Sequence, residues 1–529
     1  MAKRQLLFPI LILALAAGVR LAFLDLKPPH FDEGINGWFC DEMSKQGYYA
    51  YDSTNYHGPL HFYVLFVFLK LLGRNLWALR LPVVLVGTLT VFLVLQFRPF
   101  LGQTVSYLAA LGMAVSPGFI FYSRYSIHET WLVFFLILTF WGALGLHACR
   151  APRYVWSLVL GITGMILTKE TYIIHAAAVG TAGIAGSLLE KIRPSAAYLE
   201  RSKNPLPRGH FVAAILVGLA LIVFFYSGNF LNWSGLKGLY QTFLPWTKTG
   251  IEAAGHGKPD YDLCPLFLGF LGHIAPFSSF SRFTINWYWI KLFLAYEWFA
   301  LAGFLFSVRY LFGGQAVLRY LAIYAVATLF FYSVIPYKTP WCIISIAWPF
   351  LFLGSALLEF LATHLHRIVA VLAGAVLFGQ AGWRSYKVNF VNFDNPKEMY
   401  VYVQTFRDYQ KFTEPILDKA AQDPSQKKQL KGVILLSSYF PIPWILGDFP
   451  NIGYYSRDDH WPAQLDTDFI AVEQPQASEV EARLKDKYFV VDFRLRDGMS
   501  DCIAYFRYST FKDIFPDQAP DFDPSQLRE

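Results

Sequence analysis

The chain begins with an apolar segment that is followed closely by two adjacent carboxylates. Residues 1–24 read MAKRQLLFPILILALAAGVRLAFL, and residues 30–37 read HFDEGING. Because about 20 predominantly apolar residues suffice to cross a bilayer, residues 5–24 are predicted to form a first membrane helix. Asp32 and Glu33 then lie just outside the membrane, either in an ordinary solvated loop or at a catalytic site.

Composition supports a membrane protein along most of the chain. Of 529 residues, 55% are hydrophobic, 18% aromatic and only 16% charged, whereas soluble domains contain about 25% charged residues. The net charge of +7 comes largely from short basic segments between apolar runs, which the positive-inside rule explains without a nucleic-acid partner. The five Cys residues form no CxxC pattern and indicate no disulfide framework.

Apolar runs of membrane length recur throughout residues 1–384. Together with the first helix they predict eleven spans, and a short hairpin within 263–277 would add two more. The ten further spans are expected near 80–97, 104–122, 129–148, 154–168, 171–189, 211–228, 288–308, 316–335, 341–362 and 367–383.

One further apolar run, residues 57–73, is ambiguous because its apolar core is short and two His and one Lys lie in it. If it does not span, the basic loop 191–208 and the other Arg-rich connections lie on the same side as Lys3 and Arg4. We therefore interpret 57–73 as an interfacial or re-entrant helix at the outer face. The N-terminus is then cytoplasmic, in a multi-pass protein of the cell (inner) membrane.

The first helix has one competing interpretation. The tripeptide ALA at 14–16 could act as a signal-peptidase site. The apolar character continues to Leu24, however, which favours an uncleaved helix.

The same topology brings six polar segments to the outer side, three of them within the loops 25–79 and 229–287 of the membrane domain. This convergence is harder to explain by interfacial anchoring than any one segment is. The segments are HFDEG, NYHGPL, SRYSIHE (123–129), TKET (168–171), GHGKPDY (255–261) and YKTPW (337–341).

Residues 385–529 differ in character and are predicted to form a small extramembrane α/β domain. They contain three strand-like runs, VILLSS, FIAVEQ and YFVVDFRL, and ASEVEARLKDK (477–487) resembles an amphipathic helix. An odd number of spans after a cytoplasmic N-terminus places this domain outside, in the periplasm or the extracellular space.

Three carboxylates are candidate catalytic groups. Asp32 and Glu33 follow a membrane helix directly, where partial desolvation can raise a carboxyl pKa toward the range useful to a general base. Glu129 begins the 129–148 helix, where a carboxylate also interacts favourably with the helix dipole without any catalytic role.

Several cationic side chains are candidates for binding an anion at the outer face. Lys169 and Glu170 lie at an otherwise apolar helical junction, where charged residues tend to be functional. With His57, Lys258 and Lys338, Lys169 would supply donors to a phosphate. A divalent metal held by His57 and His256 with a carboxylate is a further hypothesis, although the sequence has no HExxH or CxxC spacing.

An ordered set of motifs resembles one family over essentially the whole chain. The set is FDEG (31–34), YHGPLHFY (56–63), ALRLP (78–82), SPGFIFYSRYSIHE (116–129), LTKET (167–171), HGKP (256–259) and YKTPW. It resembles the GT-C glycosyltransferases that use lipid-phosphate sugars, which include protein O-mannosyltransferases and the aminoarabinose transferase of lipid A. The tail SSYFPIPWILGDFPNIGYYS (437–456) is similar to a flippase-activity-associated branch of this group.

The resemblance implies a GT-C bundle of about 11–13 helices and an inverting transfer of a sugar from a polyprenyl-phosphate donor. The acceptor is an unidentified hydroxyl of a protein, lipid or glycan at the outer face. Asp32 matches the presumed base, and Glu33 or Glu129 would orient Asp32 or the sugar. The residues expected to bind substrate are Tyr56, His57, Arg124, His128, Lys169, Glu170, Lys258 and Lys338.

The chain departs from the family pattern at three positions. His57 stands where relatives have a Lys, Tyr56 where some have a metal-binding Glu, and Trp341 follows the proline of the YKTPW motif. His256 matches a histidine that binds zinc in the aminoarabinose enzymes. The resemblance therefore implies no required cofactor, while a divalent ion (Zn, Mg or Mn) remains an alternative.

Two other functions compete with sugar transfer. A lipid-linked sugar flippase would place charged residues through the depth of the membrane, whereas here they gather at one face. A non-catalytic accessory subunit that keeps the fold is the second alternative, because fold does not determine function.

Overall fold

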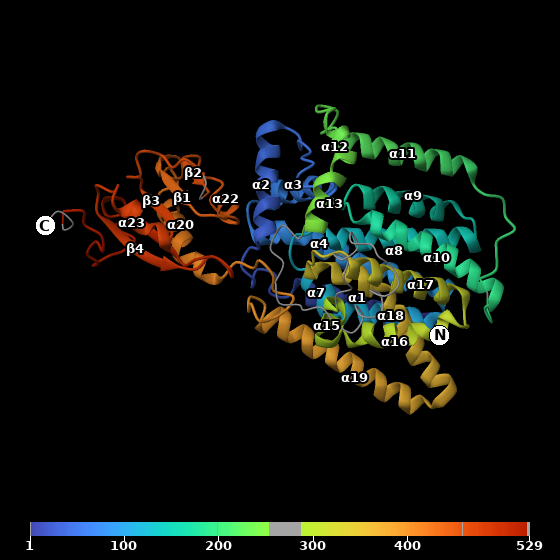
Figure 1. Ribbon diagram of the computed structural model, residues 1–529. Helices are drawn as coiled ribbons and strands as arrows, with labels where there is room; N and C mark the ends of the chain where they lie inside the picture. The colour runs from blue at the N-terminus through green and yellow to red at the C-terminus, as the bar shows by residue number, and fades with distance from the viewer. Residues whose placement is uncertain (1, 198, 253–286, 457–458, 526–529) are drawn as a thin grey trace, which may run out of the picture. The chain divides into compact units, whose positions relative to one another are not determined.

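The computed structural model describes residues 2–197, 199–252, 287–456 and 459–525. By their internal contacts these residues form two compact units (Figure 1). The first unit comprises residues 1–24, 46–393 and 398–400, and the second comprises residues 25–45, 394–397 and 401–529. The segment 25–45, expected to be a loop of the membrane domain, thus packs with the C-terminal residues.

The first unit is helical. Its helices are α1 (Ala2–Leu21), α3 (Leu60–Leu72), α4 (Leu76–Leu95), α5 (Arg98–Leu101), α6 (Gln103–Val115), α7 (Pro117–Tyr122), α8 (Glu129–Ala148), α9 (Pro152–Ile166), α10 (Tyr172–Ile192), α11 (Arg208–Tyr226), α12 (Gly235–Gln241), α13 (Phe243–Glu252), α15 (Tyr288–Ala295), α16 (Trp298–Leu311), α17 (Ala316–Val334), η1 (Pro340–Cys342), α18 (Ile343–Phe360), η2 (Leu361–Leu365), α19 (Arg367–Tyr386) and η3 (Lys387–Val391).

All eleven predicted spans are helical in whole or in part, and seven helices of the described residues are long and apolar enough to cross a membrane. These seven correspond to the predicted spans from 80, 129, 171, 211, 316, 341 and 367. The predicted hairpin within 263–277 lies outside the described residues. Helix α3 has 13 residues, about 20 Å, which is shorter than the ~30 Å hydrocarbon core; its interfacial position remains a prediction.

Two predicted spans, 104–122 and 288–308, are each two helices instead of one, and the breaks meet in the structure. Glu297, between α15 and α16, is buried and accepts hydrogen bonds from the Ser116 hydroxyl (2.8 Å) and the Gly118 amide (2.7 Å) at the start of α7. A carboxylate is stabilised by the free amides at a helix N-terminus, so this contact compensates for the interrupted helical hydrogen bonds. Tyr400 also donates to Glu297 (3.0 Å).

Buried arginines terminate α1. Arg124 donates to the carbonyls of Val19, Arg20, Ala22 and Phe23 at 2.6–3.1 Å. Arg80 of the ALRLP motif donates to Leu24 O at 2.7 Å. The last carbonyls of a helix have no partner within the helix, and cations there are also favoured by the helix dipole. The ALRLP and YSR motifs therefore fix the chain where it leaves α1.

The second unit contains a five-stranded sheet of order β2-β1-β3-β5-β4, in which β1 pairs in parallel with β2 and β3 and the remaining pairs are antiparallel. The domain is thus α/β, as expected. Its elements are α2 (Phe31–Gln46, all but its last residue), η4 (Arg407–Tyr409), α20 (Gln410–Gln422), α21 (Gln426–Gln429), β1 (Gly432–Leu435), α22 (Ile442–Ile445), β2 (Ile452–Tyr455), β3 (Phe469–Glu473), η5 (Gln474–Gln476), α23 (Ala477–Glu481), β4 (Tyr488–Phe493), β5 (Cys502–Arg507) and α24 (Tyr508–Phe511).

The three predicted strands are β1, β3 and β4, whereas β2 and β5 were not predicted. The helix predicted over 477–487 ends at Glu481 and is therefore shorter than expected. Residues 482–487 instead form the connection that leads to β4. In this connection the amides of Lys485 (2.8 Å) and Asp486 (3.1 Å) donate hydrogen bonds to Asp466.

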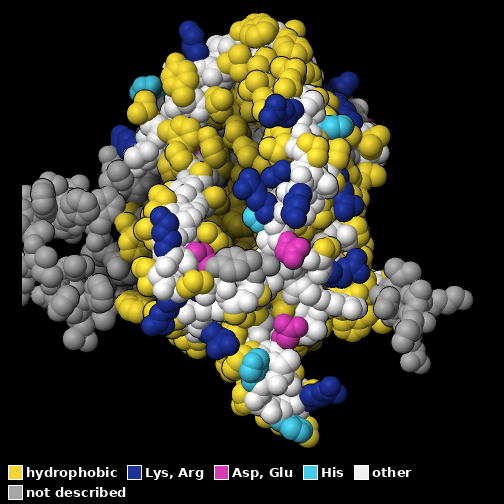
Figure 2. Space-filling model, turned by 90° about the vertical axis from the view of Figure 1, so that its right-hand side faces the viewer, with side chains coloured by type: hydrophobic (Ala, Val, Ile, Leu, Met, Phe, Trp, Pro, Cys, Tyr) yellow, Lys and Arg dark blue, Asp and Glu magenta, His cyan; other side chains and the backbone are white. Residues whose placement is uncertain are grey.

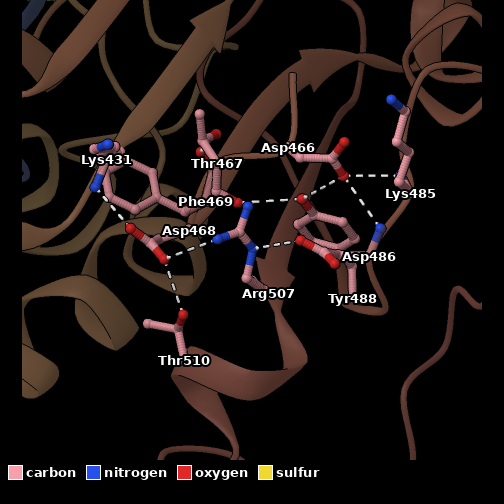
Figure 3. Close-up of polar contacts among 10 residues, drawn as sticks. All are labelled: Lys431, Asp466, Thr467, Asp468, Phe469, Lys485, Asp486, Tyr488, Arg507 and Thr510. Atoms are coloured by element: carbon pink, nitrogen blue, oxygen red, sulfur yellow. Dashed lines mark hydrogen bonds and ion pairs between the residues drawn. The ribbon is translucent and has the colours of Figure 1, made fainter. Parts of the chain in front are cut away.

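A polar network joins the strand ends on one side of this sheet (Figure 3). Asp468, at the start of β3, accepts hydrogen bonds from the Lys431 amide and the Thr510 hydroxyl, both at 2.9 Å. Arg507, at the end of β5, lies between Asp468 (3.6 Å) and Asp486 (3.1 Å). The acidic residues shown in Figure 3 thus have partners within the domain, which indicates a structural role.

Helix α2 packs on the segment that follows β1, and two glycines allow the close approach. A Cβ atom at Gly34 would lie 2.4 Å from the backbone Cα of Pro441, and one at Gly37 would lie 2.1 Å from the Trp444 ring. The FDEGINGW sequence is therefore a packing motif as well as a carrier of carboxylates, because glycine is needed for such a close approach.

We expect Gly34→Ala to lower the free energy of unfolding by about 1–3 kcal/mol, the usual cost of overpacking a tight contact. Thermal unfolding of the purified full chain would measure this as a lower Tm. The matched control is Gly180→Ala in α10, where an added Cβ meets no atom within 4 Å. Equal melting of the Gly34 variant and wild type would contradict the proposed tight contact.

Candidate functional site

The first unit contains a cavity of about 90 Å³ that gathers residues from three of the predicted polar segments, NYHGPL, TKET and YKTPW. This volume is below the ~300–1,000 Å³ of typical small-molecule sites, so the cavity admits the end of a ligand rather than a whole lipid-linked sugar. Its lining residues are Tyr56, His57, Lys169, Glu170, Thr171, Ile174, Trp246, Trp289, Tyr332, Ile335, Tyr337, Thr339, Trp341 and Cys342.

Lys169 forms a buried ion pair beside this cavity. Its Nζ lies 2.5 Å from Glu129 Oε1, and both side chains are less than a tenth exposed. Burial lowers the pKa of Lys169, but attraction by Glu129 and then Glu170 outweighs burial and raises the pKa above its ordinary value. Lys169 therefore stays protonated and contributes a fixed positive charge to the cavity wall.

His57 and Glu170 form a second pair in the cavity. His57 Nδ1 lies 3.0 Å from Glu170 Oε2, and the histidine is more exposed than its partner. Burial raises the pKa of Glu170, but Lys169 and His57 outweigh that effect and hold the pKa below its ordinary value. A hydrogen bond from Nδ1–H to a carboxylate fixes the ring orientation and leaves Nε2 for another partner.

Three imidazole rings, those of His57, His61 and His128, pack against one another in tilted and edge-on arrangements at the cavity. The His128 ring lies 4.6 Å from both the His57 and the His61 rings, and His61 Nε2 lies 3.0 Å from the Ser126 hydroxyl. Burial, and then the neighbouring His61, His57 and Lys169, lower the pKa of His128 well below its ordinary value. A neutral His128 supports His57 by packing and does not compete with it for an anion.

Aromatic residues form much of the cavity wall and were mostly not predicted as site residues. Trp246 comes from α13, Trp289 and Tyr332 come from α15 and α17, and Trp341 belongs to the YKTPW motif. Among the sequence motifs, YKTPW was the one that indicated aromatic residues at this wall, through Tyr337 and Trp341. In the sequence, Trp289 cannot be distinguished from aromatic residues that lie at a membrane interface. In the structure, its indole donates a hydrogen bond to Tyr332 O (2.9 Å), which places the ring in the cavity wall.

Other predicted substrate-binding residues lie elsewhere or have other partners. Lys338 donates to three carbonyls at the end of α17, those of Tyr332 (2.7 Å), Ser333 (3.0 Å) and Ile335. Arg124 binds the end of α1, as described above. Lys258 and His256 lie outside the described residues.

Asp32 and Glu33 belong to the second unit, in the first turn of α2. Glu33 is fully buried and accepts a hydrogen bond from the His30 amide (2.9 Å). His30 Nδ1 accepts from the Asp32 amide (3.1 Å), and its Nε2–H donates to Tyr402 O (2.7 Å). This reciprocal arrangement resembles a capping box, with the His30 ring accepting from the second amide of the helix instead of the third. Glu33 and His30 therefore stabilise the first turn of α2. The Asp32 carboxylate remains about 30% exposed.

An arginine of the C-terminal domain holds the same helix start. The Arg496 guanidinium lies 4.3 Å from the Phe31 ring centroid and donates to the carbonyls of Ser438 and Phe440, both at 3.3 Å. Burial lowers the pKa of Arg496 to about 10, and the Asp32 charge opposes that shift. The helix start that carries Asp32 is thus held by an arginine more than 400 residues away in sequence.

The part of the chain that the structure describes contains no cluster of side chains suited to bind a metal ion. There, no three His, Cys, Asp or Glu side chains are grouped so that they could hold an ion. His57 Nδ1, one expected ligand atom, instead bonds Glu170.

Comparison with known families gives one match. Residues 56–199 match the family of dolichyl-phosphate-mannose-protein mannosyltransferases. No curated protein matches the sequence. The matched segment contains Tyr56, His57, Glu129, Lys169 and Glu170, which all lie at or beside the cavity.

Solved structures resemble the chain over nearly its whole length. ArnT from Cupriavidus metallidurans bound to undecaprenyl phosphate is 14% identical, with 94% of this chain and 97% of that chain covered and a TM-score of 0.54. The Archaeoglobus fulgidus oligosaccharyltransferase tethered with an acceptor peptide is 12% identical, with 94% and 74% covered and a TM-score of 0.53. Both are GT-C glycosyltransferases.

The chain has the GT-C fold. The fold and the apolar helices make it a multi-pass membrane protein. The family match and the shared GT-C architecture together support a glycosyltransferase.

Proposed function

We propose that the chain is an inverting glycosyltransferase that moves a sugar from a polyprenyl-phosphate donor to an acceptor hydroxyl. The observation that carries this proposal is that the His, Lys and Glu side chains of the cavity, His57, Lys169 and Glu170, all lie within the segment that matches the mannosyltransferase family. The undecaprenyl phosphate bound to ArnT supports the donor class.

The cavity is suited to the leaving phosphate. Lys169 keeps its charge, and an ammonium has three N–H donors, of which Glu129 occupies one. His57, oriented by Glu170, donates from Nε2 when it is protonated. Both groups stabilise charge that develops on the phosphate as the glycosidic bond breaks. Phosphate is a good leaving group, so this half of the reaction requires no general acid.

Asp32 is the proposed general base. A sugar or protein hydroxyl is a weak nucleophile, and a positioned carboxylate accelerates its attack by removing its proton. The Asp32 carboxylate is partly exposed, and Glu33, His30 and Arg496 fix the helix start that carries it. It is therefore suited to this role. Attack opposite the departing phosphate in a single displacement inverts the anomeric carbon. Glu129, which was expected to orient Asp32 or the sugar, is proposed to act by holding Lys169.

The reaction is proposed to occur at the outer face of the cell membrane, with the N-terminus in the cytoplasm and the C-terminal domain, predicted as residues 385–529, outside. The acceptor is a protein, a lipid or a glycan. The acceptor peptide tethered to the A. fulgidus enzyme supports a protein acceptor, and no step is routed through a metal ion.

A direct assay tests the proposed function. The purified full chain is reconstituted in vesicles with a radiolabelled polyprenyl-phosphate sugar on one leaflet and with mixed acceptors. Covalent transfer of the label is the expected result. Movement of intact donor between leaflets without transfer would indicate a flippase, and neither activity would favour an accessory subunit.

A further inference from the structure

A second cavity, of about 430 Å³, lies at the opposite end of the first unit from α3, where α4 ends and α9 begins. The N-terminus lies at this end of the bundle (Figure 1). The cavity does not share a residue with the candidate site. Its lining residues are Gln96, Arg98, Pro99, Gln103, Tyr107, Trp141, Arg153 and Tyr154.

Two arginines, Arg98 and Arg153, make this cavity basic. Arg98 lies over the Tyr107 ring and Arg153 over the Tyr154 ring, at 5.8 and 4.7 Å from the ring centroids. Each also donates to the phenol oxygen of a tyrosine, at 3.4 and 2.9 Å. Among the described residues no carboxylate lies within ion-pair distance of either guanidinium. The tyrosines therefore orient two positive charges that have no acidic partner in the part of the chain that the structure describes.

Guanidinium groups arranged in this way favour a phosphate. Their planar donors bind phosphate oxygens in pairs, and stacking on an aromatic ring reduces the entropy lost when they do so. Basic pockets between membrane helices on the cytoplasmic side bind anionic lipid head groups. The positive-inside pattern predicts that this end of the bundle faces the cytoplasm.

A third cavity, apolar and of about 420 Å³, is lined in part by sequence neighbours of the residues that line the second cavity. Phe97 and Leu101 line the apolar cavity while Arg98 lines the other, and Phe140 and Trp141 divide in the same way. The only charged residue of the apolar lining, Glu190, is ion-paired with Arg319 (2.7 Å). Figure 2 looks onto this end of the unit and shows a hollow lined by hydrophobic side chains with Lys and Arg side chains around it.

We propose that these two cavities form a binding site for a phosphate-bearing membrane lipid. Arg98 and Arg153 bind the head-group phosphate, and the apolar cavity receives a hydrocarbon chain. The site is separate from the proposed donor site and does not depend on the proposed function. An anionic phospholipid carries both parts, whereas free phosphate would use only the arginine cavity.

The test measures binding of short-chain phosphatidylglycerol to the delipidated full chain in detergent. We expect Arg98→Gln/Arg153→Gln to weaken binding at least tenfold. The matched control, Arg208→Gln, removes an exposed arginine outside both cavities and should bind as wild type. Unchanged binding in the double variant would overturn the proposal, as would an equal loss in the control. Unchanged Tm and elution volume would confirm that the variants are folded.

Two further measurements distinguish the lipid from free phosphate. Ala143→Phe narrows the apolar cavity and should weaken phosphatidylglycerol binding while leaving any binding of inorganic phosphate unchanged. If inorganic phosphate displaces the lipid at equal concentration, or if the Ala143 variant binds the lipid normally, the site does not hold a hydrocarbon chain and the proposal fails.

Discussion

Asp32→Asn is expected to lower the turnover number for sugar transfer by about 10²–10⁴-fold, the range that general-base catalysis contributes. Asparagine keeps the shape of the side chain but cannot accept a proton at neutral pH. Because the Asp32 amide and not its carboxylate bonds His30 Nδ1, the start of α2 should remain intact. Initial rates with a labelled lipid-phosphate sugar, with saturating acceptor, would measure the effect.

The control for this prediction is Asp25→Asn, which removes an exposed carboxylate from the same segment of chain. It should transfer sugar at the wild-type rate. If Asp32→Asn keeps near-normal turnover, Asp32 is not the base. A parallel fall in both variants would point to the overall charge of the segment.

Lys169→Met should destabilise the protein by about 3–5 kcal/mol, the cost of breaking a buried ion pair from one side. The substitution leaves Glu129 and Glu170 buried close to the same point without the cation that compensates them. The Tm of the detergent-solubilised protein should fall accordingly. The control Lys191→Met removes an exposed lysine and should change stability by less than about 0.5 kcal/mol.

A companion substitution separates ion pairing from packing. In Lys169→Met/Glu129→Gln the uncompensated charge of Glu129 is gone, so most of the lost stability should return. Transfer should remain low, because the phosphate has lost a donor. If the double variant is no more stable than the single one, the side chain of Lys169 stabilises the site by packing instead of charge.

Much of the architecture was predictable because hydropathy is a local property. Composition and length predicted the eleven apolar runs and three strands of the C-terminal domain. Topology predicted the convergence of four polar segments, NYHGPL, SRYSIHE, TKET and YKTPW. The breaks at Ser116 and Glu297 were not predicted, although a Ser-Pro-Gly sequence and a Glu interrupt these two runs. The hydrogen bond that joins the breaks links residues 181 positions apart, which no local pattern shows.

The sequence by itself determined that this is a polytopic membrane protein of GT-C type with polar residues gathered at helix ends. Tertiary structure alone decided how those residues are paired. It joined Lys169 to Glu129, turned Arg124 and Lys338 into helix caps, and placed α2 with Asp32 on the C-terminal domain through Gly34 and Gly37. Such pairings depend on the register and distance between packed elements, and a linear pattern of residue types does not encode these quantities locally.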